Sequence, residues 1–308
     1  MSDEGTRYDE FSMFEGNCED AGLPWTGQPV VRRQSFTLAS GQKLSALVWG
    51  EAPPELVFLH GGGQNAHTWD TVVLGLDRPA IAFDLPGHGH SDWRADRDYW
   101  PVSNAAAVAE AVDQIGVKPR AVIGMSLGGL TAIRLAATRP DLVPQAVVVD
   151  VTPGVHQRAI AMTLEERGTT ALIGGPKIYD SFDEIYEATL ALSPYRKPSG
   201  VRRGVLHNAR QLDDGRWRWR YDIGGGDDRE GQATAPPDFL GLWDDVDRLS
   251  MPVMLVEGAL SKHVLPEHDA EFRRRKPDTR VEVVDGAGHA VQSDQPNVLI
   301  GLLRDFLD

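Results

Sequence analysis

A serine between glycines has the clearest chemical potential in this chain of 308 residues. Ser126 stands in Gly124-Met125-Ser126-Leu127-Gly128, after a short apolar run and before a helical pattern that begins at Leu127. A strand that passes directly into a helix makes a sharp turn, and the glycines leave room for a strained serine. Free N–H groups at the start of the helix would face an oxyanion formed beside it. The pattern therefore favours a nucleophilic serine over an ordinary surface serine.

A histidine near the C-terminus has the setting of a base for this serine. A serine hydroxyl is a weak nucleophile near neutral pH, so it needs a base within hydrogen-bond reach that a third group orients. His289 follows an expected strand at 281–284, lies in a glycine-containing loop and precedes the last helical pattern. The alternative is a histidine that only stabilises a tight turn. For His60, which lies between an apolar strand and three glycines, we expect a bracing role in the loop that follows.

Short apolar strands alternate with helical patterns on both sides of the serine. Strands are expected at 56–59, 80–83, 121–123, 145–149 and 253–256. Continuous apolar strands separated by helices indicate a parallel sheet that is covered on both faces. The base should then lie at the carboxyl edge of that sheet, beyond the serine in sequence.

The alternation divides the chain into three parts. Residues 29–151 and 246–308 carry the strand–helix pattern and form the expected core. Residues 1–28 are polar and are expected to be an irregular arm. Residues 152–245 break the pattern and are interpreted as a cap inserted between two strands. Its glycine- and proline-rich part, 224–237, is expected to be a mobile loop.

Composition excludes several classes of protein. The content of hydrophobic residues is 41%, yet no run of 18 apolar residues predicts a membrane-spanning helix. The acidic first residues do not resemble a secretory signal, and the single cysteine, Cys18, favours a reducing cytoplasm. The net charge of −14 argues against nucleic acid or an anionic membrane as the main partner.

Cofactors are not expected either. The sequence contains no phosphate-binding loop, no paired metal-ligand cluster and no dinucleotide fingerprint. We therefore expect no cofactor, no metal and a small-molecule substrate, and we make no prediction of oligomeric state.

Four short motifs resemble those of the α/β-hydrolase family in their order and spacing. They are His60-Gly61-Gly62-Gly63, Asp84-x-x-Gly87-x-Gly89-x-Ser91, Gly124-x-Ser126-x-Gly128 and Gly286-x-Gly288-His289. Residues 203–208 and 217–222 are also similar to a small group of bacterial carboxylesterases. The resemblance implies an α/β-hydrolase fold, in which a mostly parallel central sheet is flanked by helices and carries an inserted cap.

The resemblance also implies roles for individual residues. Ser126 corresponds to the nucleophile and His289 to the general base. The backbone N–H groups of Leu127 and Gly62, with Gly63 as an alternative to Gly62, correspond to the oxyanion hole. Such preorganised donors are each worth about 10²–10³ in rate.

The acid of the expected triad departs from the family pattern. Family members usually place it after the strand that ends here at Val256, where Lys262 occupies the position in which an aspartate is common. An alternative known in the family places the acid one strand earlier, and Asp150 stands there. Asp150 could instead be a strand-end residue that starts a turn. We favour Asp150 as the acid, with Glu257 as the second candidate.

These observations predict a cofactor-free serine hydrolase that cleaves carboxylic esters through an acyl-enzyme. Halide or epoxide chemistry in this fold normally uses an aspartate nucleophile, so Ser126 argues against both. The same triad could cleave C–C bonds or lactones, and a slow-turnover binding protein or receptor could keep the triad. The fold does not decide among these alternatives.

Overall fold

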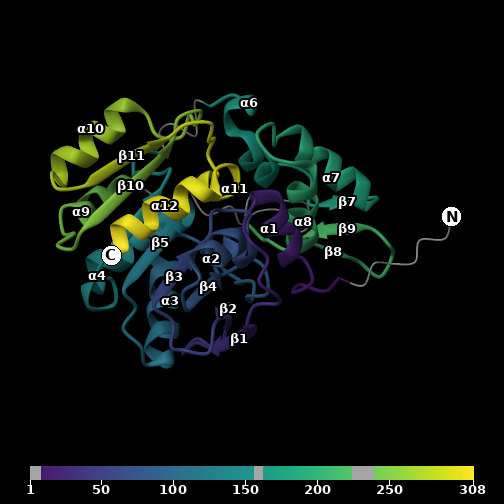
Figure 1. The fold of residues 1–308 in the computed structure, drawn as a ribbon, viewed down its shortest axis with the longest axis horizontal. Coiled ribbons are helices and arrows are strands. Elements are labelled where there is room, and N and C mark those ends of the chain that lie inside the picture. The colour runs from purple at the N-terminus through teal and green to yellow at the C-terminus, as the bar shows by residue number, and fades with distance from the viewer. Residues whose placement is uncertain (1–7, 156–161, 224–238) are drawn as a thin grey trace.

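The computed structural model describes residues 8–155, 162–223 and 239–308. An eight-stranded sheet lies at the centre, in the order β1-β2-β4-β3-β5-β6-β10-β11 (Figure 1). The pairs β1–β2 and β2–β4 are antiparallel, and the other neighbours are parallel. The strands are β1 (Val31–Thr37), β2 (Lys43–Trp49), β3 (Leu56–Leu59), β4 (Ala80–Asp84), β5 (Ala121–Met125), β6 (Ala146–Val149), β10 (Val253–Gly258) and β11 (Arg280–Val284).

The apolar strands at the centre of the sheet bury both of their faces. In β3, Leu56 and Phe58 belong to one hydrophobic cluster, whereas Val57 and Leu59 belong to another on the opposite face. Successive side chains of a strand point to opposite faces, so a strand between two helix layers must be apolar throughout. The predicted mostly parallel sheet is confirmed.

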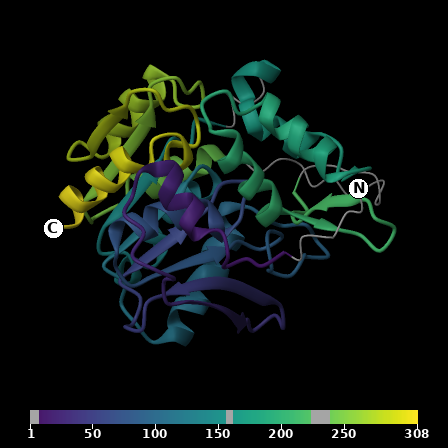
Figure 2. The same ribbon diagram turned by 45° about the vertical axis from the view of Figure 1, so that its right-hand side comes forward.

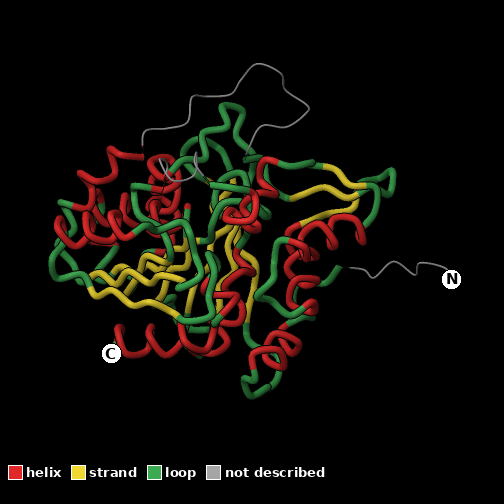
Figure 3. Tube along the Cα trace, turned by 90° about the horizontal axis from the view of Figure 1, so that it is seen from above, coloured by secondary structure: helices red, strands yellow, loops and turns green. Residues whose placement is uncertain are grey.

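Helices form a layer on each face of the sheet (Figure 3). One layer shares a cluster with the sheet residues around Leu56 and contains α1 (Phe14–Ala21), α2 (Asp70–Leu76), α11 (Val291–Asp294) and α12 (Pro296–Leu307). The other layer contains α3 (Pro101–Ile115), α4 (Leu127–Thr138), α9 (Leu242–Val246) and α10 (Pro266–Arg275). In the described ranges, no helix has both the length and the apolar character needed to cross a bilayer.

The arm at the N-terminus is not irregular throughout, and that prediction is wrong for residues 14–21. They form α1, which ends at Gly22 in a left-handed conformation. Phe14 and Cys18 lie one turn apart and are both buried, and the Phe14 ring packs on Trp49 with centroids 4.9 Å apart. Two apolar positions among polar neighbours are enough to anchor a helix when the sheet supplies the partner surface.

Residues 162–223 form a separate group of elements between β6 and β10 in sequence (Figure 2). A small antiparallel sheet in the order β7-β9-β8 packs with helices around a hydrophobic cluster of its own. The predicted mobile loop at 224–237 lies outside the described residues. The elements are α6 (Leu164–Arg167), β7 (Ile178–Tyr179), α7 (Phe182–Ala191), α8 (Pro198–Asn208), β8 (Ala209–Gln211) and β9 (Trp217–Trp219).

Short 3-10 turns complete the described chain. The turns are η1 (Ala66–Trp69), η2 (Pro140–Leu142), η3 (Gly168–Gly174) and η4 (Phe239–Gly241). η1 and η4 precede the helices α2 and α9, whereas η2 and η3 lie between a helix and the strand that follows it, and none exceeds seven residues.

The turn from β5 to α4 depends on close backbone packing. A Cβ atom on Gly128 would lie 2.2 Å from the carbonyl oxygen of Leu59, and one on Gly124 would lie 2.2 Å from that of Gly128. Contacts this short are forbidden, so only glycine lets α4 approach β3 and β5 this closely. The turn holds Ser126 at the carboxyl edge of the sheet.

This packing predicts opposite effects of the same substitution at two glycines. Gly128→Ala should destabilise the fold by about 1–3 kcal/mol, because the turn must shift to accept a methyl group. Gly301→Ala is the matched control, since Gly301 is exposed in α12 and no atom lies within 4 Å of its added Cβ. It should stabilise the fold by about 0.5–1 kcal/mol. Urea unfolding measures both changes, and a Gly128→Ala variant as stable as the parent would contradict the close approach.

Candidate active site

Three side chains that are far apart in sequence meet at the carboxyl edge of the sheet. Ser126 follows β5, Asp150 follows the adjacent β6, and His289 lies in the loop after β11. The Ser126 Oγ and His289 Nε2 atoms are 3.0 Å apart. The His289 Nδ1 and Asp150 Oδ2 atoms are 2.7 Å apart. The structure therefore joins the three side chains named from the sequence in one hydrogen-bonded chain.

Backbone strain marks two of these positions. Ser126 has φ 51° and Asp150 has φ 53°, values in the left-handed region that residues with a Cβ rarely adopt. Each residue directly follows a buried strand. Such strain persists only where the surrounding structure holds it, and it is common at functional sites. After each of these two strands the chain thus turns sharply away from the sheet and presents one polar side chain at the sheet edge.

The Asp150 carboxylate is fully buried but well supplied with donors. Its Oδ1 accepts the N–H of Gly258 at 2.9 Å, and its Oδ2 accepts the hydroxyl of Ser261 at 2.5 Å. Burial raises the pKa of Asp150 to about 6, and the hydrogen bonds from Ser261 and Gly258 oppose that rise. The carboxylate is consequently an anion at neutral pH.

The imidazole of His289 is neutral in the free protein. Its side chain is 11% exposed, and burial lowers its pKa, with the nearby Arg196 acting in the same direction and Asp294 against it. Because an ionised carboxylate can only accept hydrogen bonds, Nδ1–H of His289 must donate to Asp150. The lone pair of Nε2 is then available to the Ser126 hydroxyl. This tautomer is the one that a general base requires.

The second candidate acid, Glu257, is not bonded to His289. It lies in β10 and is half-buried, with a buried Oε1 that has no hydrogen-bond partner within the described ranges. Burial raises the pKa of Glu257 to about 7, and the negative charges of Asp269 and Asp150 add to the rise. Of the two candidates, the structure places only Asp150 in contact with the imidazole.

In the glycine loop after β3, residues 61–63, one backbone N–H group has no hydrogen-bond partner among the described residues. The N–H of Gly61 donates to Gln64 Oε1 at 3.1 Å, and that of Gly63 donates to His88 Nε2 at 3.1 Å. No hydrogen bond occupies the N–H of Gly62 within the part of the chain that is described. Leu127 begins α4, so its N–H has no partner inside the helix. Gly62 and Leu127 thus retain the donors that the resemblance assigned to the oxyanion hole, and Gly63 does not.

His60 holds this loop in place from within the core. It is fully buried, and burial lowers its pKa to about 4, so the imidazole is neutral. Its Nε2 accepts the N–H of Leu85 at 2.9 Å, which leaves Nδ1–H to donate to the carbonyl of Gly61 at 2.7 Å. The bracing role expected from the sequence matches these contacts.

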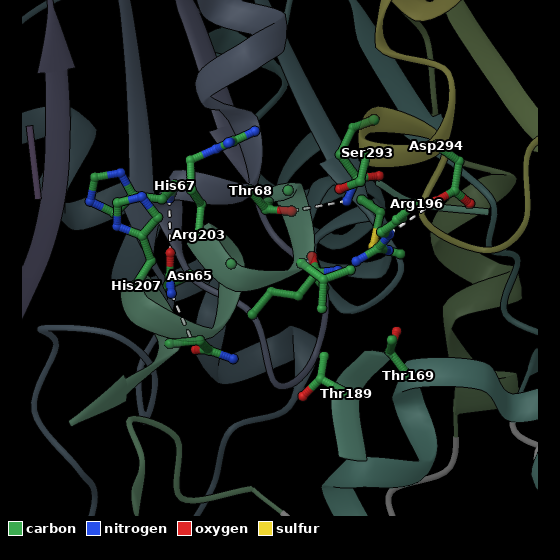
Figure 4. A pocket seen from close by; sticks show the side chains of 18 of the residues that line it. Asn65, His67, Thr68, Thr169, Thr189, Arg196, Arg203, His207, Ser293 and Asp294 are labelled. Atoms are coloured by element: carbon green, nitrogen blue, oxygen red, sulfur yellow. Dashed lines mark hydrogen bonds and ion pairs between the residues drawn. The ribbon is translucent and has the colours of Figure 1, made fainter. Parts of the chain in front are cut away.

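A cavity of about 410 Å³ opens at Ser126 and His289. Its walls come from the glycine loop, from the arm and from residues 162–223. Figure 4 shows polar side chains around it, among them Thr68, Thr169 and Thr189. Charged side chains such as Arg196, Arg203 and Asp294 also line the cavity, and an apolar part of the wall includes Leu172, Ile173, Val201, Trp219 and Tyr221. A ligand of mixed polarity could therefore reach the serine.

Two groups of histidine and aspartate hold three possible metal-ligand atoms within 4.8 Å of one another: His67 with Asp70 and His207, and Asp150 with His263 and His289. In each group the two imidazole rings are stacked 12° from parallel, with centroids 3.7 Å and 3.4 Å apart. A metal ion lies close to the plane of each imidazole that binds it, and two stacked planes share no such point. One imidazole of each group is also hydrogen-bonded to its aspartate. The geometry suits hydrogen bonding better than coordination.

Sequence reasoning missed the turn that follows β10. In this region the sequence pointed only to Glu257 and to the aspartate that Lys262 replaces. Gly258, the last residue of β10, and Ser261 in the turn hydrogen-bond the Asp150 carboxylate. The missed signal is a serine three residues after the strand-end glycine, next to a strand that ends in an aspartate.

Known proteins resemble this chain over most of its length. The model of the Alpha/beta hydrolase family matches residues 56–301. The chain is 48% identical to the esterase Rv0045c of Mycobacterium tuberculosis, over 99% of this chain and 98% of that protein. A solved structure of that esterase superposes with a TM-score of 0.84, covering 98% of this chain and 100% of the other.

More distant relatives share the same fold. The mouse sn-1-specific diacylglycerol lipase ABHD11 is 28% identical over 82% of this chain and 81% of its own. A structure of E-2-(acetamidomethylene)succinate hydrolase is 24% identical, with a TM-score of 0.76 over 91% of this chain and 100% of that chain. The fold class expected from the four motifs is confirmed, and this chain belongs to the alpha/beta hydrolase family.

Proposed function

We propose that this protein is a serine hydrolase that cleaves carboxylic esters through an acyl-enzyme intermediate. The observation that carries the proposal is the hydrogen-bonded chain from Ser126 through His289 to Asp150, placed at the mouth of a cavity. The name of the 48% identical relative, an esterase, supports the same reaction class. The proposed partner is a small-molecule ester, and a cytoplasmic location stays a prediction from the sequence.

Each residue of the hydrogen-bonded chain has a role in the proposed mechanism. The Ser126 hydroxyl attacks the ester carbonyl while Nε2 of His289 takes its proton. Asp150 stabilises the imidazolium that forms, and the N–H groups of Gly62 and Leu127 receive the oxyanion. The imidazolium then protonates the leaving alcohol, and a water molecule hydrolyses the acyl-enzyme by the same route in reverse.

We also propose that residues 152–245 act as a cap on a core formed by 29–151 and 246–308. Two observations support this division. The described part of 152–245 has its own small sheet and hydrophobic cluster, and its residues form much of the cavity wall. The arm at 1–28 contributes Asn17 and Asp20 to the same wall. Selection among esters would therefore depend on the cap and the arm.

The nucleophile is tested by substitution and labelling. Ser126→Ala should abolish labelling by a fluorophosphonate probe and lower kcat on p-nitrophenyl esters by up to about 10⁶-fold. Ser293→Ala is the matched control, because Ser293 lines the same cavity outside the hydrogen-bonded chain, and it should change kcat little. Near-parental turnover by Ser126→Ala would remove Ser126 from the mechanism. Full labelling of the parent without steady turnover would instead favour the slow-turnover binding protein.

The acid is tested by two neutral isosteres. Asp150→Asn keeps the shape of the side chain but offers the wrong partner to Nδ1–H, so kcat should fall about 10⁴-fold with the fold intact. Glu257→Gln should cost less than about tenfold, equivalent to about 1.4 kcal/mol, because Glu257 does not touch His289. Steady-state kinetics at pH 8 measure both. The reverse order of effects would assign the acid to Glu257.

If His289 is the general base, kcat/KM should rise with pH. His289 must be neutral to accept a proton, so activity is lost as pH falls through the pKa of the free enzyme. Because burial lowers that pKa, the inflection should lie below the ordinary histidine value of about 6.5. Rates measured between pH 4.5 and 8.5 locate it, with circular dichroism at each pH to show that the chain stays folded. An inflection above 7.5 would contradict a buried neutral base.

A further inference from the structure

The turn after β10 contacts both the acid and the base of the proposed triad. Gly258 and Ser261 each donate one hydrogen bond to the Asp150 carboxylate, one to each oxygen. Two residues further on, the ring of His263 stacks on the ring of His289, with centroids 3.4 Å apart and planes 12° from parallel. One short segment thus hydrogen-bonds the carboxylate of Asp150 and stacks on one face of the imidazole of His289.

The stack restrains a motion that the hydrogen bonds leave free. Bonds from Nδ1 to Asp150 and from Nε2 to Ser126 hold two edges of the His289 ring. They allow the ring to tilt about the line that joins those two edges. A parallel ring in van der Waals contact blocks the tilt, and His263 is only 5% exposed and so cannot swing away freely.

His263 and Ser261 do not line the cavity at Ser126, whereas His289 does. Neither residue is therefore placed to touch an ester bound there. Any effect of these residues on rate must pass through Asp150 or His289. That separation makes them positioning residues and makes their role measurable.

We propose that residues 258–263 form a positioning turn for the proposed reaction, in which Ser261 orients the Asp150 carboxylate and His263 fixes the plane of the His289 ring. The proposal rests on the proposed function and adds residues to it. Where relatives usually carry the acid after this strand, this chain carries the groups that hold an acid supplied by β6.

Several charges act on the Asp150–His289 pair and stay in place in the Ser261 variants below, whereas the His263 variants also remove the interaction of His263 with Asp150. Asp294 and Arg196 face His289, and Glu257 faces Asp150 from β10. His263 itself lies beside both members of the pair. A change in the pH profile of the Ser261 variants can therefore be assigned to the lost hydroxyl, which donates to Asp150 and accepts the N–H of His263 at 3.2 Å.

The stack is tested by His263→Ala and His263→Phe. The alanine variant removes the restraint on the ring and should lower kcat about 10–10²-fold with KM unchanged, since a misplacement of this size costs about that much. The phenylalanine variant keeps a flat ring without nitrogen atoms and should restore kcat to within about threefold of the parent. The proposal is overturned if the alanine variant keeps its kcat, or if phenylalanine gives no rescue.

The hydrogen bond from Ser261 to the Asp150 carboxylate is tested by Ser261→Ala and Ser261→Thr. Loss of the hydroxyl leaves the Asp150 anion less stabilised, so it holds the imidazolium more strongly. The inflection of kcat/KM should then move to higher pH by about 0.5–1 unit, and threonine should restore it. A role in stability alone would lower the urea midpoint and leave the inflection unmoved, which would overturn the proposal.

The rate of Ser126 labelling by a fluorophosphonate separates this proposal from the proposed function. A parent chain that is neither labelled nor active on esters refutes the proposed function, and the positioning role with it. A labelled and active parent whose His263→Ala variant labels at the parental rate refutes the positioning role alone. Slower labelling of His263→Ala, rescued in His263→Phe, supports it.

Discussion

A buried carboxylate that must remain charged is the constraint on which this site depends. Asp150 is fully buried, and a carboxylate removed from water needs donors that replace its hydration. The donors are Gly258 at the end of β10, Ser261 in the turn after it, and His289 in the loop after β11. The strand order β6-β10-β11 therefore also determines which groups surround the Asp150 carboxylate. It brings three hydrogen-bond donors to this anion.

The same constraint explains where the backbone is strained. Ser126 and Asp150 directly follow two neighbouring parallel strands, and both have a left-handed backbone conformation. This conformation directs both side chains towards His289. That strain of about 1–3 kcal/mol at each residue must be offset by packing around it. At Ser126 the offset comes from the close contact of α4 with β3, which Gly128 permits. At Asp150 it comes from the hydrogen bonds to the carboxylate.

The sequence predicted what depends on local pattern and left open what depends on distant partners. Ser126 and His289 were recognisable because glycines, strands and helices next to them in sequence create their setting. Asp150 needed the further observation that the usual position was occupied by Lys262. The hydrogen bond from Ser261 to Asp150 was not predictable in this way, because the two residues lie 111 positions apart in sequence and the contact depends on the path of a turn.

The difference between Gly62 and Gly63 illustrates the same limit, since the N–H of Gly63 donates to His88, which lies 25 residues away in sequence. A comparable dependence joins residues 162–223 to the loop that carries His289. Asp294, in α11, accepts the N–H of Gly288 at 2.9 Å and Arg196 Nε at 3.0 Å (Figure 4). Gly288 precedes His289, and Arg196 belongs to the loop between α7 and α8. A movement of that loop would therefore act on the histidine through one carboxylate, which links the shape of the cavity to the position of the base.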